Sequence, residues 1–194
     1  RDTCRYSRLI ADIGVEAATK LQDDLIHHRL SMLLEANLCD IRLMCSPNQN
    51  DNYFVQRKQQ YDIALFDQHG ADLGERLLSG ATEALQHYKH CVVIGTDAPA
   101  LDADLIKQAI AGLQSKAEVV IVPAEDGGYV LIAMSSAYAC LFQDVDWGTD
   151  KVLQQTLEKM SDNNIAYKTL PVCWDVDRLE DYQRYLVNFV QNLL

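Results

Sequence analysis

Short runs of apolar residues, rich in valine and isoleucine, alternate along this chain with longer segments whose apolar residues recur every three or four positions. The short runs are residues 41–45, 63–66, 91–94, 119–122, 129–133 and 166–170. Runs of this length predict β-strands, and the segments between them predict helices. This alternation predicts an α/β fold, a three-layer sandwich with helices on both faces of a mostly parallel, mixed sheet. Residues 91–94 are compactly apolar, so we expect their strand near the centre of that sheet.

Two of the predicted helices bear on function. Residues 14–37 carry apolar side chains at helical spacing, among them Leu21 and Leu25, and this pattern leaves Arg29 on another face. Asp102 precedes a second apolar-periodic segment, and we expect its side chain to cap that helix.

Composition excludes several classes of protein. The chain has 194 residues, 48% of them hydrophobic, with no internal repeat or linker, which favours one domain over residues 1–194. No apolar run approaches the roughly 20 residues of a membrane helix, and no signal core is visible, so we expect a soluble cytoplasmic protein. Six scattered cysteines without a Cys-x-x-Cys pair favour reduced thiols over disulfides or a thiolate metal site.

The net charge of −11 makes nucleic acid a poor partner. It does not exclude a nucleotide, because a divalent cation can neutralise phosphate groups against carboxylates.

Acidic residues follow three of the predicted strands, where ligands of open α/β sheets bind. They lie in residues 95–99, 123–129 and 174–177. Carboxylate oxygens in this arrangement suit Mg²⁺ or Mn²⁺, which keep water ligands and take further oxygens from phosphate.

Each acidic position also has a structural explanation. Asp97 could form an Asx-turn before Ala98 and Pro99, and Asp126 could belong to a tight turn between two strands. Asp177, with Glu180 three residues later, matches a capping box for the last helix. Taken one at a time, the structural interpretation is preferred; taken together, three acidic strand ends favour a site.

Five segments in register carry a resemblance to a known family. They read QHGADLGERL, GTDAPAL, PAEDGGY, WGTDKVL and DVD, at residues 68–77, 95–101, 123–129, 147–153 and 175–177. In this order they resemble the bacterial radical-SAM/selenodomain-associated transferases, which are regarded as glycosyltransferases. That family is similar to nucleotide-diphospho-sugar transferases of GT-A fold and, more distantly, to 2-phospholactate guanylyltransferase. The resemblance spans nearly the whole chain.

The resemblance implies a role for each matching residue. Asp97, Asp175 and Asp177 would be ligands of a phosphate-bound Mg²⁺ or Mn²⁺. Asp126 and Glu125 would be catalytic on the acceptor side, as base or second-metal ligand. Arg8 matches the arginine of a lysine–threonine–arginine–leucine signature near the nucleotide phosphates. The nucleotide-binding set implied in this way is Arg8, Arg5, Gln68, Thr96, Asp97, Gly127 and Gly128, the two glycines letting the backbone approach the substrate.

The sequence departs from the family at its start. Tyr6 replaces the lysine of the signature, and the hydrophobic first strand and the glycine-containing basic loop of the family do not precede it. Arg1 and Arg5 could supply the positive charge. Three functions therefore stay open: a metal-dependent glycosyltransferase with a nucleotide-diphospho-sugar donor, a nucleotidyltransferase of guanylyltransferase type, or a non-catalytic relative that binds a nucleotide.

Overall fold

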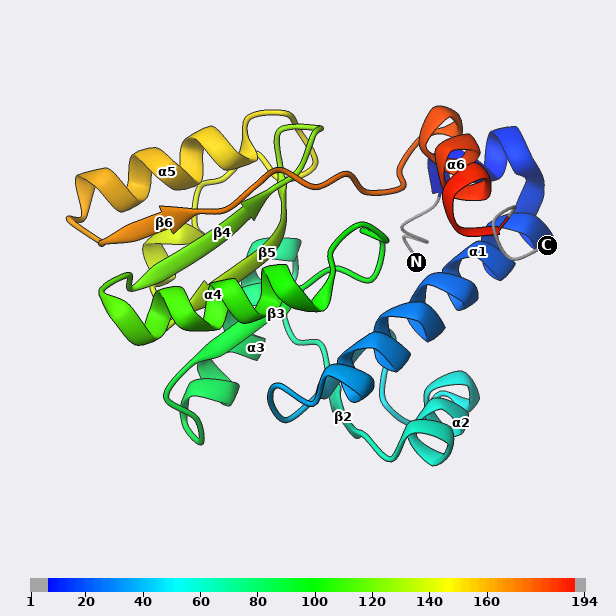
Figure 1. Cartoon of the computed structure of the whole chain (residues 1–194), viewed down its shortest axis with the longest axis horizontal. Helices are drawn as coiled ribbons and strands as arrows, with labels where there is room; N and C mark the ends of the chain where they lie inside the picture. Colours follow the sequence, from blue (N-terminus) through cyan, green and yellow to red (C-terminus); the bar gives the residue numbers. More distant parts are fainter. Residues whose placement is uncertain (1–6, 191–194) are drawn as a thin grey trace.

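Six strands in two sheets organise the part of the chain that the computed structural model describes, residues 7–190 (Figure 1). The smaller sheet is a parallel pair, β1 (Arg42–Cys45) and β2 (Ala64–Asp67). The larger sheet has the order β3-β5-β4-β6. Its members are β3 (Cys91–Ile94), β5 (Tyr129–Met134), β4 (Val119–Pro123) and β6 (Tyr167–Thr169). β5 runs antiparallel to both of its neighbours, whereas β4 and β6 are parallel, so the predicted mixed sheet is confirmed.

Helices cover both faces of the larger sheet, as an α/β sandwich requires. They are α3 (Leu73–Leu85), α4 (Ala103–Ser115) and α5 (Val152–Asp162), and Figure 1 shows α4 and α5 on opposite sides of the sheet. Successive residues of β4 point to opposite faces. Val120 therefore packs in the core cluster that includes Ile106 of α4, and Ile121 packs in the cluster that includes Met160 of α5.

Side-chain caps fix where two of these helices begin. The carboxylate of Asp102 accepts a hydrogen bond from the Leu105 amide at 2.9 Å, so its predicted capping role is confirmed. Asp72 caps α3 in the same way, through the Glu75 amide at 2.8 Å. Both caps follow directly from a short polar side chain placed before an apolar-periodic segment.

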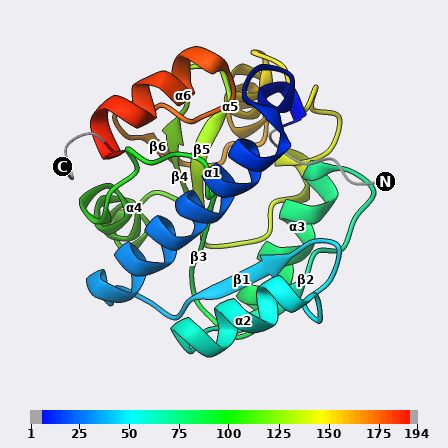
Figure 2. The same ribbon diagram turned by 90° about the vertical axis from the view of Figure 1, so that its right-hand side faces the viewer.

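A long helix, α1 (Ser7–Ala36), joins the remaining elements (Figure 2). Its first half packs with residues 174–176 and with α6 (Leu179–Tyr185), which continues as the π-helical turn η2 (Leu186–Val190). Its second half packs on β1, β2 and α2 (Asn52–Tyr61). Gly14, at φ 80° and ψ 164°, interrupts the helical geometry near the start.

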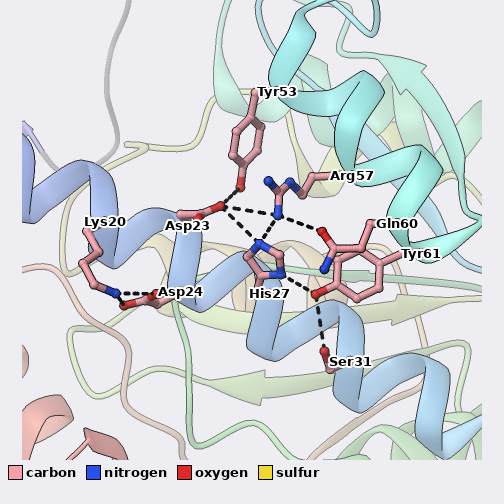
Figure 3. A network of polar contacts seen from close by, with 9 residues as sticks. All are labelled: Lys20, Asp23, Asp24, His27, Ser31, Tyr53, Arg57, Gln60 and Tyr61. Carbon is pink, nitrogen blue, oxygen red and sulfur yellow. Dashed lines mark hydrogen bonds and ion pairs between the residues drawn. The ribbon is translucent and has the colours of Figure 1, made fainter.

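Polar side chains also fasten α1 to α2. Figure 3 shows Tyr53 and Arg57 of α2 pointing toward Asp23 and His27 of α1. The Tyr53 hydroxyl donates to Asp23 Oδ1 at 2.7 Å, and Arg57 Nη1 lies 3.8 Å from the same oxygen. These polar contacts add to the apolar packing between α1 and α2.

The predicted central position of residues 91–94 is wrong. β3 lies at an edge of the larger sheet, where it pairs with β5 alone, and all four of its residues are partly exposed. A short apolar run shows that a strand is buried in part, but it does not show how many neighbours the strand has.

No helix within residues 7–190 is long and apolar enough to cross a bilayer.

Candidate functional site

The three acidic segments predicted from the sequence meet through backbone hydrogen bonds. The Val176 amide donates to the carbonyl oxygen of Asp97 at 2.9 Å, which joins the end of β3 to the segment containing Asp175 and Asp177. The Glu125 amide donates to the Cys173 carbonyl at 3.0 Å, which joins the same segment to the loop after β4. Residues 173–177 therefore run between the other two acidic segments and bring all three to one end of the sheet.

Asp97 is the most deeply buried carboxylate of the site, with 4% of its surface exposed. The guanidinium of Arg29, 2% exposed, donates to the carbonyl oxygens of Ala98 and Leu101 in the turn that follows Asp97. Burial lowers the pKa of Arg29 to about 10, and the negative charge of Asp97 acts in the opposite direction. The helical pattern predicted that Arg29 lies on another face than the apolar residues of its helix; this prediction is wrong, because Arg29 is buried together with Leu21 and Leu25.

Asp177 does not cap the last helix, so the predicted capping box is also wrong. The carboxylate of Asp181 instead accepts the amides of Arg178, at 2.9 Å, and of Asp177, at 3.2 Å. The Asp177 carboxylate accepts from Arg8 Nη1 at 2.5 Å. Arg8 and Asp177, both predicted site residues, thus form an ion pair. The Asp177 carboxylate takes no part in capping α6, which was the structural explanation for this residue.

The loop that carries Glu125 and Asp126 has a defined shape. Asp126 Oδ1 accepts from the Gly128 amide at 2.9 Å, which is the geometry of an Asx-turn, so the structural interpretation of this residue is supported. Glu125 Oε2 accepts from Arg184 of α6 at 2.9 Å. The Arg184 guanidinium also lies over the Trp174 ring, 4.4 Å from its centre. Sequence reasoning missed Arg184, because nothing in the pattern of α6 distinguishes it from a solvated surface charge.

Gly127 brings this loop against the start of α5. Its φ is 91°, and a Cβ atom there would lie 2.3 Å from the Asp150 carbonyl oxygen. Its own carbonyl accepts from the Leu153 amide at 2.9 Å. Gly74 makes a similar close contact with Trp147, where an added Cβ would lie 2.5 Å from Nε1. The segments at 68–77 and 123–129 therefore both pack on the segment at 147–153.

The other predicted nucleotide-binding residues occupy different places. Thr96 is partly buried beside Asp97, and Gly128 lies within the Asx-turn. Gln68 follows β2, and its side-chain amide donates to the Met44 carbonyl at 3.0 Å. This side chain therefore binds the neighbouring strand β1 of the two-stranded sheet. Arg5 and Tyr6 lie outside the described residues. Binding of a nucleotide by any of these residues stays a prediction.

The donor set can be compared with what a hard cation requires. Within residues 7–190, no three His, Cys, Asp or Glu side chains are grouped so as to hold an ion by themselves. Mg²⁺ in nucleotide sites commonly takes one or two carboxylates, completing its shell with water and phosphate oxygens. The buried Asp97 and the adjoining segment with Asp175 and Asp177 supply carboxylates in that number, and binding of a cation by them stays a prediction.

Several solved structures share the fold of this chain. A putative nucleotide-diphospho-sugar transferase from Desulfovibrio desulfuricans G20 is 28% identical, with a TM-score of 0.81 over 95% of this chain and 82% of that one. CMP:2-keto-3-deoxy-manno-octonic acid synthetase, complexed with CTP, is 11% identical and has a TM-score of 0.61, covering 87% of this chain and 88% of that one. A cytidylyltransferase from Leptospira borgpetersenii is 12% identical with a TM-score of 0.56, covering 86% and 76%.

These likenesses confirm the predicted fold class, the nucleotide-diphospho-sugar transferase type. No curated protein matches the sequence closely enough to count as a relative. One family model matches residues 29–149, which is more than half of the chain. The chain therefore belongs to the family described as "Uncharacterized protein conserved in bacteria (DUF2064)".

Proposed function

We propose that this protein transfers a sugar from a nucleotide-diphospho-sugar donor with the help of a divalent cation. The observation that carries the proposal is the meeting of three acidic segments through the Asp97–Val176 and Glu125–Cys173 backbone contacts. The likeness to the Desulfovibrio desulfuricans protein, over 95% of this chain, supports the choice of donor.

The donor side of the site is assigned to Asp97 with Asp175 or Asp177. Their carboxylates would hold Mg²⁺ or Mn²⁺, which offsets the charge of the donor diphosphate and of the leaving group. Arg8, already at Asp177, would bind the same phosphates through its fixed guanidinium donors.

The acceptor side is assigned to Asp126 and Glu125. Asp126 is exposed, and its Asx-turn holds the side chain in one orientation. A carboxylate held in this way would accept the proton of the attacking hydroxyl group. Arg184, held by Glu125 and Trp174, adds a positive charge at the edge of the same loop.

A second candidate is nucleotidyl transfer. It is favoured by the shared fold of the CTP-bound synthetase and the cytidylyltransferase. The two reactions leave different products: sugar transfer releases a nucleoside diphosphate, whereas nucleotidyl transfer from a triphosphate releases pyrophosphate. A protein that only binds the nucleotide releases neither.

The test is calorimetric titration with a panel of nucleotides and nucleotide-sugars, with Mn²⁺ or with EDTA. We expect nucleotides of one base to bind, and only in the presence of the metal. Asp97→Asn should abolish this binding, because it removes a charged carboxylate ligand of the metal. Asp51→Asn is the matched control: Asp51 caps α2 through the Tyr53 amide, and asparagine caps equally well. Binding that is equal with EDTA, or equal in Asp97→Asn, would rule out the proposed metal site.

A further inference from the structure

The least expected side chain in the structure is Arg29, a charged residue in the buried face of α1. It follows the buried Leu25 by four positions and precedes the half-buried Met32 by three, so it occupies a position where the helix pattern calls for an apolar residue. Its 2% exposure means that the whole guanidinium has left water.

Burial of such a charge is costly unless it is paired and hydrogen-bonded. Arg29 is satisfied in part: its two terminal nitrogens donate to the carbonyl oxygens of Ala98 and Leu101, while its buried Nε has no partner among the described residues. A leucine or methionine would fill the same place without this cost. Packing of α1 alone therefore does not account for an arginine here.

The Arg29 guanidinium contacts the turn that follows Asp97. Ala98 and Leu101 are the two ends of that turn, closed by the Leu101 amide donating to the Ala98 carbonyl at 3.1 Å. The turn leads from Asp97 directly to Asp102, the cap of α4. The planar fork of an arginine places two donor nitrogens at a fixed separation, one for each carbonyl oxygen, whereas a lysine offers all its donors from one nitrogen.

We propose that Arg29 is a positioning residue for the cation site: it clamps the turn at residues 97–101 through two carbonyl oxygens and provides the buried positive charge that faces Asp97. The proposal rests on the proposed function of Asp97 as a metal ligand. It assigns to α1 a second task besides packing, because the turn that follows Asp97 is held by a side chain buried inside the molecule.

The experiment compares wild type with Arg29→Lys and Arg29→Met, with Arg42→Lys as the matched control. Arg42 is a part-buried arginine in β1 that pairs with Glu83 at 2.8 Å and stacks on Phe66, away from the Asp97 turn. Two readouts are taken from each folded variant: amide hydrogen exchange at Leu101 and Val176, and the affinity for Mn²⁺ together with the member of the titration panel that binds the wild-type protein. Arg29→Lys keeps the charge, so it serves even where Arg29→Met fails to fold.

We expect Arg29→Lys to accelerate exchange at both amides and to weaken Mn²⁺-dependent nucleotide binding by about tenfold, the effect of roughly one lost hydrogen bond to a charged group. Arg42→Lys should leave both readouts unchanged. Equal loss of stability in the two lysine variants, with unchanged exchange and unchanged affinity, would reduce Arg29 to a structural residue. If the wild-type protein binds no nucleotide, the proposed function fails, and the exchange rates still decide whether Arg29 clamps the turn.

Discussion

At the scale of single residues, Asp126 is the position where structure and chemistry are hardest to separate. One of its oxygens accepts from the Gly128 amide and shapes the loop, while the carboxylate as a whole is exposed, one residue after the Glu125 amide that donates to the Cys173 carbonyl. Replacement by asparagine separates the two roles, because an amide oxygen can also accept from Gly128. The turn then persists, but the side chain no longer accepts a proton near neutral pH.

Asp126→Asn is therefore expected to lower turnover by about 10²–10⁴-fold while donor affinity and the free energy of unfolding change little. The measurement is kcat and donor affinity, determined separately. Asp144→Asn, in another exposed acidic loop, is the control. Unchanged turnover would leave Asp126 as a turn residue, whereas an equal loss of affinity and turnover would make it a metal ligand.

Candidate site residues could be predicted at the ends of strands but not inside helices. Asp97 and the segment at 175–177 were found from the sequence because an acidic residue after an apolar run is visible without coordinates. Arg29 was assigned to the wrong face although it follows Leu25 by one helical turn, because a charged residue is normally exposed and its polarity outweighed its position. Arg184 had no signal, since only the folded chain brings it to Glu125.

At the scale of elements, the loop after β4 and the start of α5 behave as one unit, joined at Gly127. Alanine there would be strained at φ 91° and would place its Cβ 2.3 Å from the Asp150 carbonyl oxygen. We expect Gly127→Ala to lower the free energy of unfolding by about 2–5 kcal/mol, the sum of backbone strain and overpacking. Urea unfolding followed by circular dichroism measures this loss.

Gly148→Ala is the control for Gly127→Ala, because Gly148 has a similar φ of 80° with nothing within 4 Å of the added Cβ. Its cost should be the strain alone, about 1–2 kcal/mol. Equal costs for the two variants would mean that the loop and α5 are not coupled through this contact.

The positions of the strands along the chain were largely predictable, whereas the order of the strands in the sheet was not. Each predicted strand is present within a residue or two, because a short apolar run between polar turns has few other uses. The edge position of β3 could not be foreseen, since strand order depends on contacts between distant segments such as β3 and β5. The cap of α6 moved from Asp177 to Arg178 and Asp181, a shift of one residue that reassigns which carboxylate is engaged.

At the scale of the whole molecule, an acidic protein carries a few arginine side chains at the candidate site. The protein carries a net charge of −11, so a nucleotide with several negative charges is repelled at long range. Arg8 at Asp177, Arg184 at Glu125 and the buried Arg29 supply positive charge at the end of the sheet where the acidic segments meet. A divalent cation adds two more charges, so nucleotide and cation should stabilise the fold jointly rather than separately.

Thermal unfolding tests this joint dependence on the intact chain. A ligand at a concentration of about 100 times its Kd stabilises the native state by about 2.7 kcal/mol. For a chain of 194 residues this corresponds to a rise in Tm of about 5–10 °C. We expect that rise with Mn²⁺ and nucleotide together, and a much smaller one with either alone, because each ligand completes the site for the other. In Asp97→Asn the joint rise should disappear, whereas Asp51→Asn should keep it in full. A full rise with nucleotide in EDTA would show that the arginines alone neutralise the phosphates, and the carboxylates would then need another role.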